Sequence, residues 1–179
     1  MRILSLCLSF FLIMSLCSCG ARDERSTLDL LCEVLAYADE STGAAQVFSS
    51  EAREGELGYI RRELLLTMYG EKRVSECFES GKGGEGENVG GFGKIEEYSL
   101  FISSRPIGEV AIFKCFSRSD TDLVARMCLE RADAIKVALN FTELEKKSET
   151  IRVQIRGRYV LFVFADHPDE ISEGFLKLV

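Results

Sequence analysis

Residues 97–103 (EYSLFIS) and 109–116 (EVAIFKCF) are two apolar, strand-like runs that lie close together in the chain. The segment between them, residues 104–108 (SRPIG), contains Pro106 and Gly108, which favour a tight reversal of the backbone. Two such runs on either side of a reversal predict a β-hairpin.

A second pair of strands follows near the C-terminus. In residues 151–156 (IRVQIR), apolar and polar side chains alternate, which is typical of a half-exposed strand. Gly157 allows a turn, and residues 159–165 (YVLFVFA) are apolar throughout. A continuous apolar run predicts a central strand that is covered on both faces.

Helical patterns surround these hairpins. Ser26 and Asp29 form a capping-box pattern ahead of an apolar stripe of Leu28, Leu31, Leu35 and Ala38, and we expect residues 39–55 to form a loop. A second stripe contains Leu57, Ile60, Leu64 and Met68 and ends at Gly70, and a short apolar piece, residues 74–78, comes after it.

Two more helices are expected in the C-terminal half. Ser119 and Asp122 form a second capping-box pattern before the longest helix, which carries Leu123, Met127, Ala134, Ile135 and Leu139. This helix either runs to Asn140 or breaks there and resumes near Glu143. The last helix follows a cap at Asp166, has Pro168 in its first turn, and turns Ile171, Phe175 and Leu178 inward. The order α-α-β-β-α-β-β-α predicts an α+β domain in which an antiparallel sheet of about four strands packs with helices.

The N-terminus has the layout of a bacterial lipoprotein signal. Arg2 is followed by the apolar residues 3–16, and Leu16-Cys17-Ser18-Cys19 closes the segment. The apolar run is short for a transmembrane helix, which needs about 20 residues, and fits an export signal. We expect cleavage before Cys19 and attachment of lipid to its sulfur. The predicted organisation is a signal peptide over 1–18, a tether over 19–25 and one domain over 26–179, with a Gly-rich loop over 81–93.

The net charge limits the classes of binding partner that we expect. The formal net charge is −7, and loss of Arg2 with the signal leaves −8. An acidic protein of this kind is not expected to bind nucleic acid. The expected partners are the membrane, through the N-terminal lipid, and a protein or an envelope polymer.

Four cysteines remain in the predicted domain: Cys32, Cys77, Cys115 and Cys128. An extracytoplasmic location would permit two disulfides in any of three pairings. Their apolar neighbours are equally compatible with free cysteines that pack as small core residues. Since no C-x-x-C pair occurs in this domain and His167 is the one histidine, we expect no metal site and no cofactor.

Three patterns resemble catalytic motifs. Residues 81–86 (GKGGEG) match G-x-G-x-x-G but lead into acidic residues and a strand instead of a helix, so we interpret them as a loop. His167 lies at a predicted helix start, where acidic neighbours suit the helix dipole. The carboxylate pairs Glu96/Glu97, Asp120/Asp122 and Glu143/Glu145 lie at the starts of elements or on polar faces, as solvated charges do.

A basic stripe is the candidate binding surface. Arg152, Gln154 and Arg156 share one face of the predicted strand, and Arg158 follows the turn. Such a stripe could contact lipid phosphates, wall polymers or an acidic partner. Charge that protects an edge strand from pairing with another chain is the simpler interpretation, which we favour.

Several of these stretches together resemble the domain-of-unknown-function family numbered 4358, which comprises small lipoproteins of Gram-positive bacteria. The resemblance covers roughly residues 57–179. It rests on residues 97–101 (EYSLF), 109–114 (EVAIFK) and 157–162 (GRYVLF), with Arg131 and Asp133 on the long helix. It implies a lipoprotein location and this fold, and supplies no catalytic or ligand residues.

The sequence thus predicts a lipid-anchored module on the outer face of the cell membrane that binds a partner and catalyses no reaction. One alternative is an envelope enzyme or redox protein that uses a cysteine thiol. Another is a structural component of an envelope complex.

Overall fold

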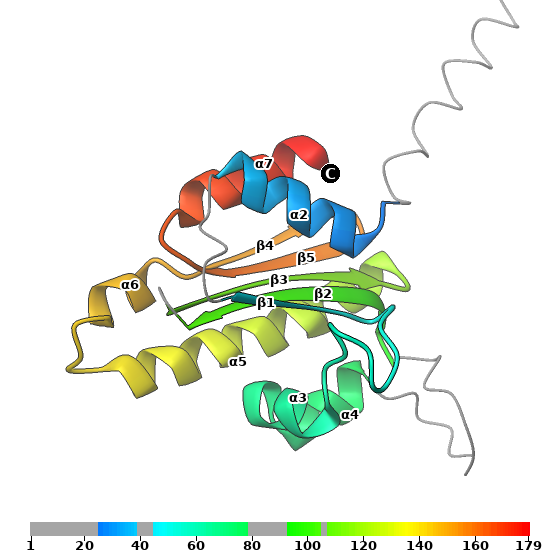
Figure 1. The fold of residues 1–179 in the computed structure, drawn as a ribbon, viewed down its shortest axis with the longest axis horizontal. Coiled ribbons are helices and arrows are strands. Elements are labelled where there is room, and N and C mark those ends of the chain that lie inside the picture. The colour runs from blue at the N-terminus through cyan, green and yellow to red at the C-terminus, as the bar shows by residue number, and fades with distance from the viewer. Residues whose placement is uncertain (1–24, 39–44, 79–92, 105–106) are drawn as a thin grey trace, which may run out of the picture.

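The computed structural model describes residues 25–38, 45–78, 93–104 and 107–179, and Figure 1 shows the arrangement of their elements. In chain order these elements are α2 (Thr27–Tyr37), β1 (Ala45–Ser49), α3 (Arg62–Tyr69), α4 (Glu71–Cys77), β2 (Ile95–Ser104), β3 (Ile107–Cys115), the 3-10 turn η2 (Arg118–Asp120), α5 (Thr121–Leu139), α6 (Glu145–Glu149), β4 (Arg152–Arg156), β5 (Tyr159–Phe164) and α7 (Pro168–Leu178).

The strands form one antiparallel sheet of five strands in the order β1-β2-β3-β5-β4. Both predicted hairpins, β2–β3 and β4–β5, are confirmed, as is the α+β class. The expected number of about four strands was one short, because β1 lies inside residues 39–55, which were predicted to be a loop. This strand has five residues without a regular alternation of exposed and buried positions, and its pairing with β2 defines it.

Helices cover both faces of the sheet, which gives three layers (Figure 1). Helices α2 and α7 pack on one face, over an apolar cluster that includes Val110, Ile112 and Leu161. Helices α3, α4 and α5 pack on the other face, over Phe113 and Phe162 among others. Eight of the nine residues of β3 and all six of β5 are buried, so the predicted burial of the 159–165 strand on both faces is confirmed.

The helix boundaries agree with the sequence patterns in part. Ser26 caps α2 and accepts a hydrogen bond from the Leu28 amide, and Gly70 ends α3 with a φ of 76°, which glycine adopts readily. The predicted start of the second helix was wrong, since α3 begins at Arg62 and Leu57 is fully exposed. Residues 74–78 belong largely to a further helix, α4.

The C-terminal half shows three further differences in detail. The predicted capping box of Ser119 and Asp122 was wrong, since α5 follows Asp120 and no side chain caps it. Instead, Ser117 Oγ donates to Asp120 Oδ2 at 2.7 Å. The long helix α5 ends at Leu139, Phe141 follows with a φ of 64°, and a separate short helix, α6, begins at Glu145. Pro168 opens α7 as predicted, whereas Asp166 does not cap it and lies 2.5 Å from Lys147 Nζ.

Within the described ranges, no helix combines the length and the apolar character needed to cross a membrane.

Replacement of Phe113 by alanine tests the packing of the α3–α5 face. The Phe113 ring makes edge-on contacts with Tyr69 and Phe78, with ring centroids 5.9 and 6.1 Å apart. We expect Phe113→Ala to lower the free energy of unfolding by about 3–5 kcal/mol, measured by urea titration. Phe141→Ala is the matched control, because that side chain is 92% exposed, and we expect a change within about 0.5 kcal/mol. Equal losses in the two variants would contradict this description of the core.

Candidate functional site

The predicted basic stripe lies on an edge strand, β4, at the end of the sheet opposite β1. The register pairs Arg152 with Val163, Gln154 with Leu161 and Arg156 with Tyr159. Since paired residues share a face, the stripe borders the layer that contains α7.

Two of the four stripe residues are engaged in contacts within the domain. Arg152 Nη2 lies 3.0 Å from Asp169 Oδ1 on α7. Arg158 Nη1 lies 2.6 Å from Glu96 Oε2 and also donates to the Cys115 carbonyl at 3.3 Å. Arg156 is exposed and forms no ion pair within the described residues. This arrangement fits charge that protects an edge strand better than a continuous basic surface.

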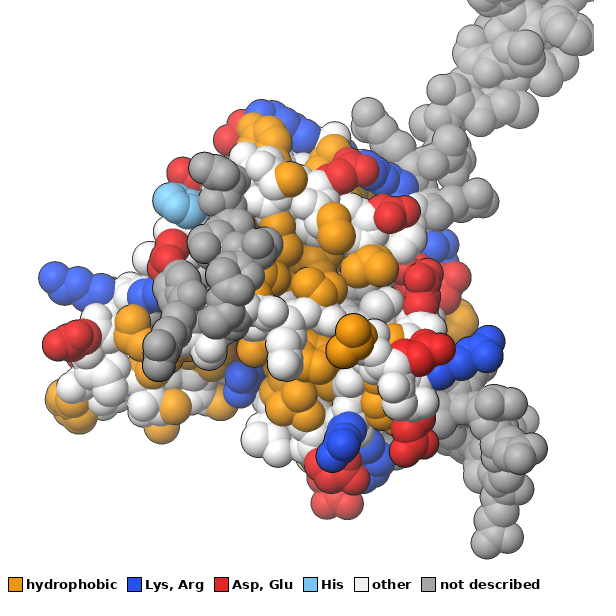
Figure 2. Space-filling model, viewed as in Figure 1, with side chains coloured by type: hydrophobic (Ala, Val, Ile, Leu, Met, Phe, Trp, Pro, Cys, Tyr) orange, Lys and Arg blue, Asp and Glu red, His pale blue; other side chains and the backbone are white. Residues whose placement is uncertain are grey.

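At the opposite edge of the sheet, the five described residues of β1 (Ala45–Ser49) include no charged side chain. In Figure 2, hydrophobic side chains cover the middle of the molecule between α2 and α3, where β1 lies in Figure 1. Val47 on β1 is partly exposed. The C-terminal part of this edge is covered by the following loop, because the Ser49 amide donates to the Gly58 carbonyl at 2.9 Å. A short strand with a covering loop limits pairing with another chain.

The four cysteines of the domain are free thiols in the structure. Burial raises the pKa of the Cys77 thiol to about 11 and that of Cys115 to about 12, and it raises the pKa of Cys128 well above its usual value. Cys32 is exposed on α2. A thiolate nucleophile needs a lowered pKa, so the three buried cysteines are poorly suited to that role.

The other catalytic candidates also have local structural roles or stand apart. Glu96 pairs with Arg158, Asp120 Oδ1 lies 3.1 Å from Lys94 Nζ, and Glu145 accepts a hydrogen bond from the Phe141 amide. His167 is exposed at the start of α7. The GKGGEG segment at residues 81–86 lies outside the described residues, as does Cys19.

A buried polar cluster, formed by Tyr69, Glu109 and Arg131, connects α3, β3 and α5. Arg131 Nη2 lies 2.8 Å from Glu109 Oε2, and Tyr69 Oη donates to Glu109 Oε1 at 3.2 Å. No pattern in the sequence predicted this cluster, although Glu109 is a charged residue at the start of an apolar run and Arg131 lies on the long helix. The link between them is spatial, since 22 residues separate the two positions.

Burial dominates the electrostatics of this cluster. The pKa of Glu109 is raised by burial, against the opposing effects of Arg131 and the hydrogen bond from Tyr69. The pKa of Tyr69 is likewise raised well above its usual value, first by burial and then by the nearby Glu109 charge. The cluster is packed into the core and serves to hold α3 and α5 against β3.

A second polar cluster holds the N-terminus of α2 on the sheet. Thr27 donates to Glu97 from its backbone amide, at 2.5 Å, and its hydroxyl lies 2.9 Å from the Ser99 hydroxyl. Tyr159 Oη donates to the Arg25 carbonyl at 2.7 Å. These contacts fix the point at which the predicted tether joins the domain.

A shallow hollow of about 500 Å³ lies beside the loop between β1 and α3. Its lining consists of Glu54, Gly55, Tyr59, Arg61, Arg62 and Glu63. Among the residues that the structure describes, no cluster of three or more His, Cys, Asp or Glu side chains is placed to hold a metal ion.

Comparisons of the chain with protein families, with curated proteins and with solved structures find no match. The resemblance to the family numbered 4358 therefore stays a prediction.

The Glu109–Arg131 pair predicts a dependence of stability on pH. The folded state binds the Glu109 proton more tightly than the unfolded chain, whose glutamate pKa is about 4.3. The contribution of Glu109 to the free energy of unfolding is therefore fully present below the unfolded-state pKa. It is lost as the pH rises through the raised pKa of the folded state. Arg131→Met removes the favourable charge, so we expect a loss of about 2–4 kcal/mol at pH 8 and a smaller loss near pH 5, measured by urea titration.

Two further variants isolate the cause of that loss. Arg126→Met on the exposed side of α5 is the matched control, and we expect a change within about 0.5 kcal/mol. Addition of Glu109→Gln to Arg131→Met should remove the extra loss at pH 8. An equal loss at both pH values would show that burial of the Glu109 charge is not the cause.

The thiols predict a clear order of alkylation. At pH 8 a thiol with a pKa of about 11 is ionised in roughly one molecule in a thousand. We therefore expect iodoacetamide to modify Cys32 quickly in the folded protein, and Cys77, Cys115 and Cys128 only after unfolding in urea, as followed by peptide mass spectrometry. Fast modification of a buried cysteine in the folded protein would favour the thiol-enzyme alternative.

Proposed function

We propose that the protein is a lipoprotein, anchored through Cys19 on the outer face of the cell membrane, whose domain binds a partner and catalyses no reaction. The observation that carries this proposal is the position of Cys19, directly after a charged start, a short apolar run and Ser18. Acyl chains contribute about 0.8 kcal/mol per buried CH₂, so several chains on one cysteine would hold the protein stably.

The state of the side chains supports a binding role over thiol chemistry. The three buried cysteines have raised pKa values, and the carboxylates Glu96 and Asp120 are neutralised by partners within the domain. These groups are committed to holding the fold, and a nucleophile or general base must instead be free to reach a substrate.

Exposed apolar side chains near the corner between α5 and α6 support the proposal that the domain binds a partner protein. Val137 on α5 is 78% exposed, and Phe141 is 92% exposed with its backbone in the left-handed region. This conformation is unfavourable for a non-glycine residue, and such strain is frequent at functional sites. An apolar pocket on another protein would cover these two side chains.

Replacement of Cys19 tests the anchor. We expect the N-terminal peptide of the mature protein to carry acyl mass at Cys19, and Cys19→Ala to abolish it, because the sulfur is the attachment point. Cys17→Ala is the matched control and should keep the acyl mass. The measurement is mass spectrometry of protein extracted from membranes.

Two results would contradict the proposal. Acyl mass that persists in the Cys19→Ala variant would show that the anchor is elsewhere. Robust turnover of a wall or lipid substrate by the purified protein would show that the domain is an enzyme. The alternative of a structural component predicts a stable larger complex after mild detergent extraction, and migration as a lone monomer would exclude it.

A further inference from the structure

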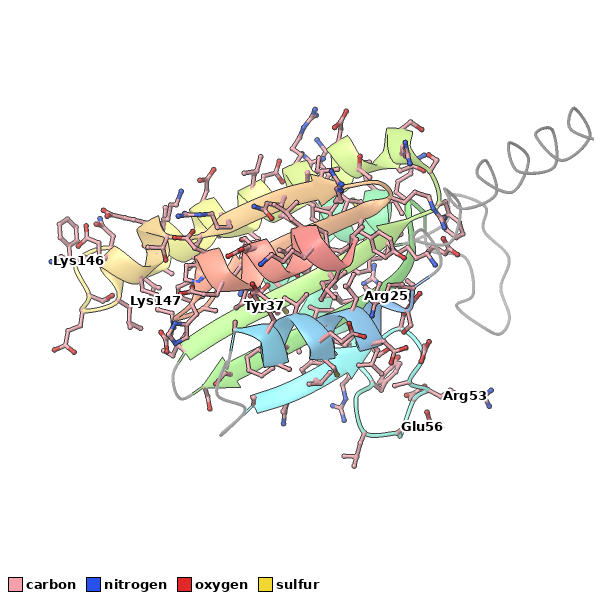
Figure 3. The ribbon with its side chains drawn as sticks, turned by 90° about the horizontal axis from the view of Figure 1, so that it is seen from above. Arg25, Tyr37, Arg53, Glu56, Lys146 and Lys147 are labelled. Atoms are coloured by element: carbon pink, nitrogen blue, oxygen red, sulfur yellow. The ribbon has the colours of Figure 1, made fainter. Side chains whose placement is uncertain are left out.

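The chain enters the domain at one end of its long axis. Figure 3 shows Arg25 toward the same end of the long axis as Arg53 and Glu56 of the loop before α3, and shows Lys146 at the opposite end. The Tyr159–Arg25 hydrogen bond fixes the entry point beside the first residue of β5. We call the part of the surface around Arg25, the loop 50–59 and residues 116–118 the anchor end.

The predicted tether is too short to let the anchor end move far from the membrane. Cys19 and Arg25 are six residues apart, and six extended residues span at most about 22 Å. This step rests on the proposed function, since it takes Cys19 as the lipid-bearing residue. A domain on so short a tether must keep one end close to the lipid headgroups.

Phe116 lies at the anchor end and is half exposed. Its amide donates to the Lys94 carbonyl at 3.1 Å, and its carbonyl accepts from Arg158 at 3.4 Å. Two residues earlier, Lys114 pairs in register with Tyr159, the residue that binds the Arg25 carbonyl. Phe116 therefore follows the end of β3 that lies next to Tyr159, the residue that holds Arg25.

Leu57 is a second exposed apolar residue at this end. It is fully exposed. It follows Glu56, which Figure 3 shows toward the same end of the long axis as Arg25, and precedes Gly58, whose carbonyl accepts a hydrogen bond from the Ser49 amide. A fully exposed leucine contributes nothing to the core, whereas burial of an apolar side chain in a membrane interface is favourable.

The charges beside Phe116 do not oppose contact with lipid. Arg158 pairs with Glu96 at 2.6 Å, and Lys94 pairs with Asp120 at 3.1 Å. At Phe116 these paired charges leave little net repulsion from phosphate headgroups. The loop 50–59 around Leu57 carries Glu51, Glu54 and Glu56 against Arg53, so contact there depends on the apolar Leu57 side chain.

From these observations we propose that the anchor end rests on the membrane that holds the lipid anchor, with Phe116 and Leu57 in its interfacial region. The lipid and the two side chains then act together, because the short tether keeps both side chains at high effective concentration near the surface. The α5–α6 corner, at the far end, points away from the membrane and stays accessible to a partner.

Single tryptophan residues test this orientation, since the chain contains none. The full-length acylated protein is reconstituted in phosphatidylcholine vesicles, with or without bromine on the acyl chains near the headgroup. We expect Phe116→Trp and Leu57→Trp each to lose roughly half of their emission in the brominated vesicles, as interfacial residues do. Phe141→Trp, at the far end, is the matched control and should keep its emission.

The outcomes separate this inference from the proposed function. Acylated protein in which Phe116→Trp or Leu57→Trp is unquenched, or in which Phe141→Trp is quenched equally, would overturn the orientation and leave the anchor standing. Absence of acyl mass would overturn both. Hydrogen exchange on the unsubstituted protein gives a second readout, because amides of 50–59 and 116–118 should exchange more slowly in vesicles than in detergent, and unchanged exchange would also overturn the orientation.

Discussion

The structure depends on one constraint, which is that β3 and β5 are apolar on both faces. Eight residues of β3 and all six of β5 are buried, so neither face of the sheet centre can be left in water. Helices must therefore cover both sides, and the chain supplies α2 and α7 for one face and α3, α4 and α5 for the other. The three layers follow from this requirement, and the two less apolar strands, β1 and β4, take the edges.

Glu109 is the costly exception within this apolar centre. Its carboxylate lies on the α5 face of β3, where removal from water raises its pKa. Arg131 and Tyr69 satisfy it, so the price of burial is offset only when α3, β3 and α5 are in their native positions. We infer that the cluster helps to specify how these elements pack.

Most of the fold could be predicted from local patterns. Residue type and spacing predict both hairpins and the long buried run at 159–165. They also predict the end of α3 at Gly70 and the start of α7 at Pro168. The start of α3 and the strand β1 could not. Leu57 matches a helical spacing by coincidence and lies in a loop, and Ala45–Ser49 becomes a strand because the edge of β2 is available to pair with it. Such long-range pairing leaves almost no signal in a five-residue segment.

The sequence by itself determined the central strands, the α+β class and the expectation of a lipid anchor at Cys19. Strands buried on two faces and export signals both produce recognisable patterns within short continuous stretches of sequence. Only the tertiary structure decided which side chains meet. In the folded protein, two residues of the basic stripe are paired with different elements: Arg152 with Asp169 on α7, and Arg158 with Glu96 on β2. The tertiary structure also joined Glu109 to Arg131 and brought Phe116 to the end where Arg25 enters. These contacts arise between elements far apart in the chain, and their geometry is set by the packing of layers that no local pattern describes.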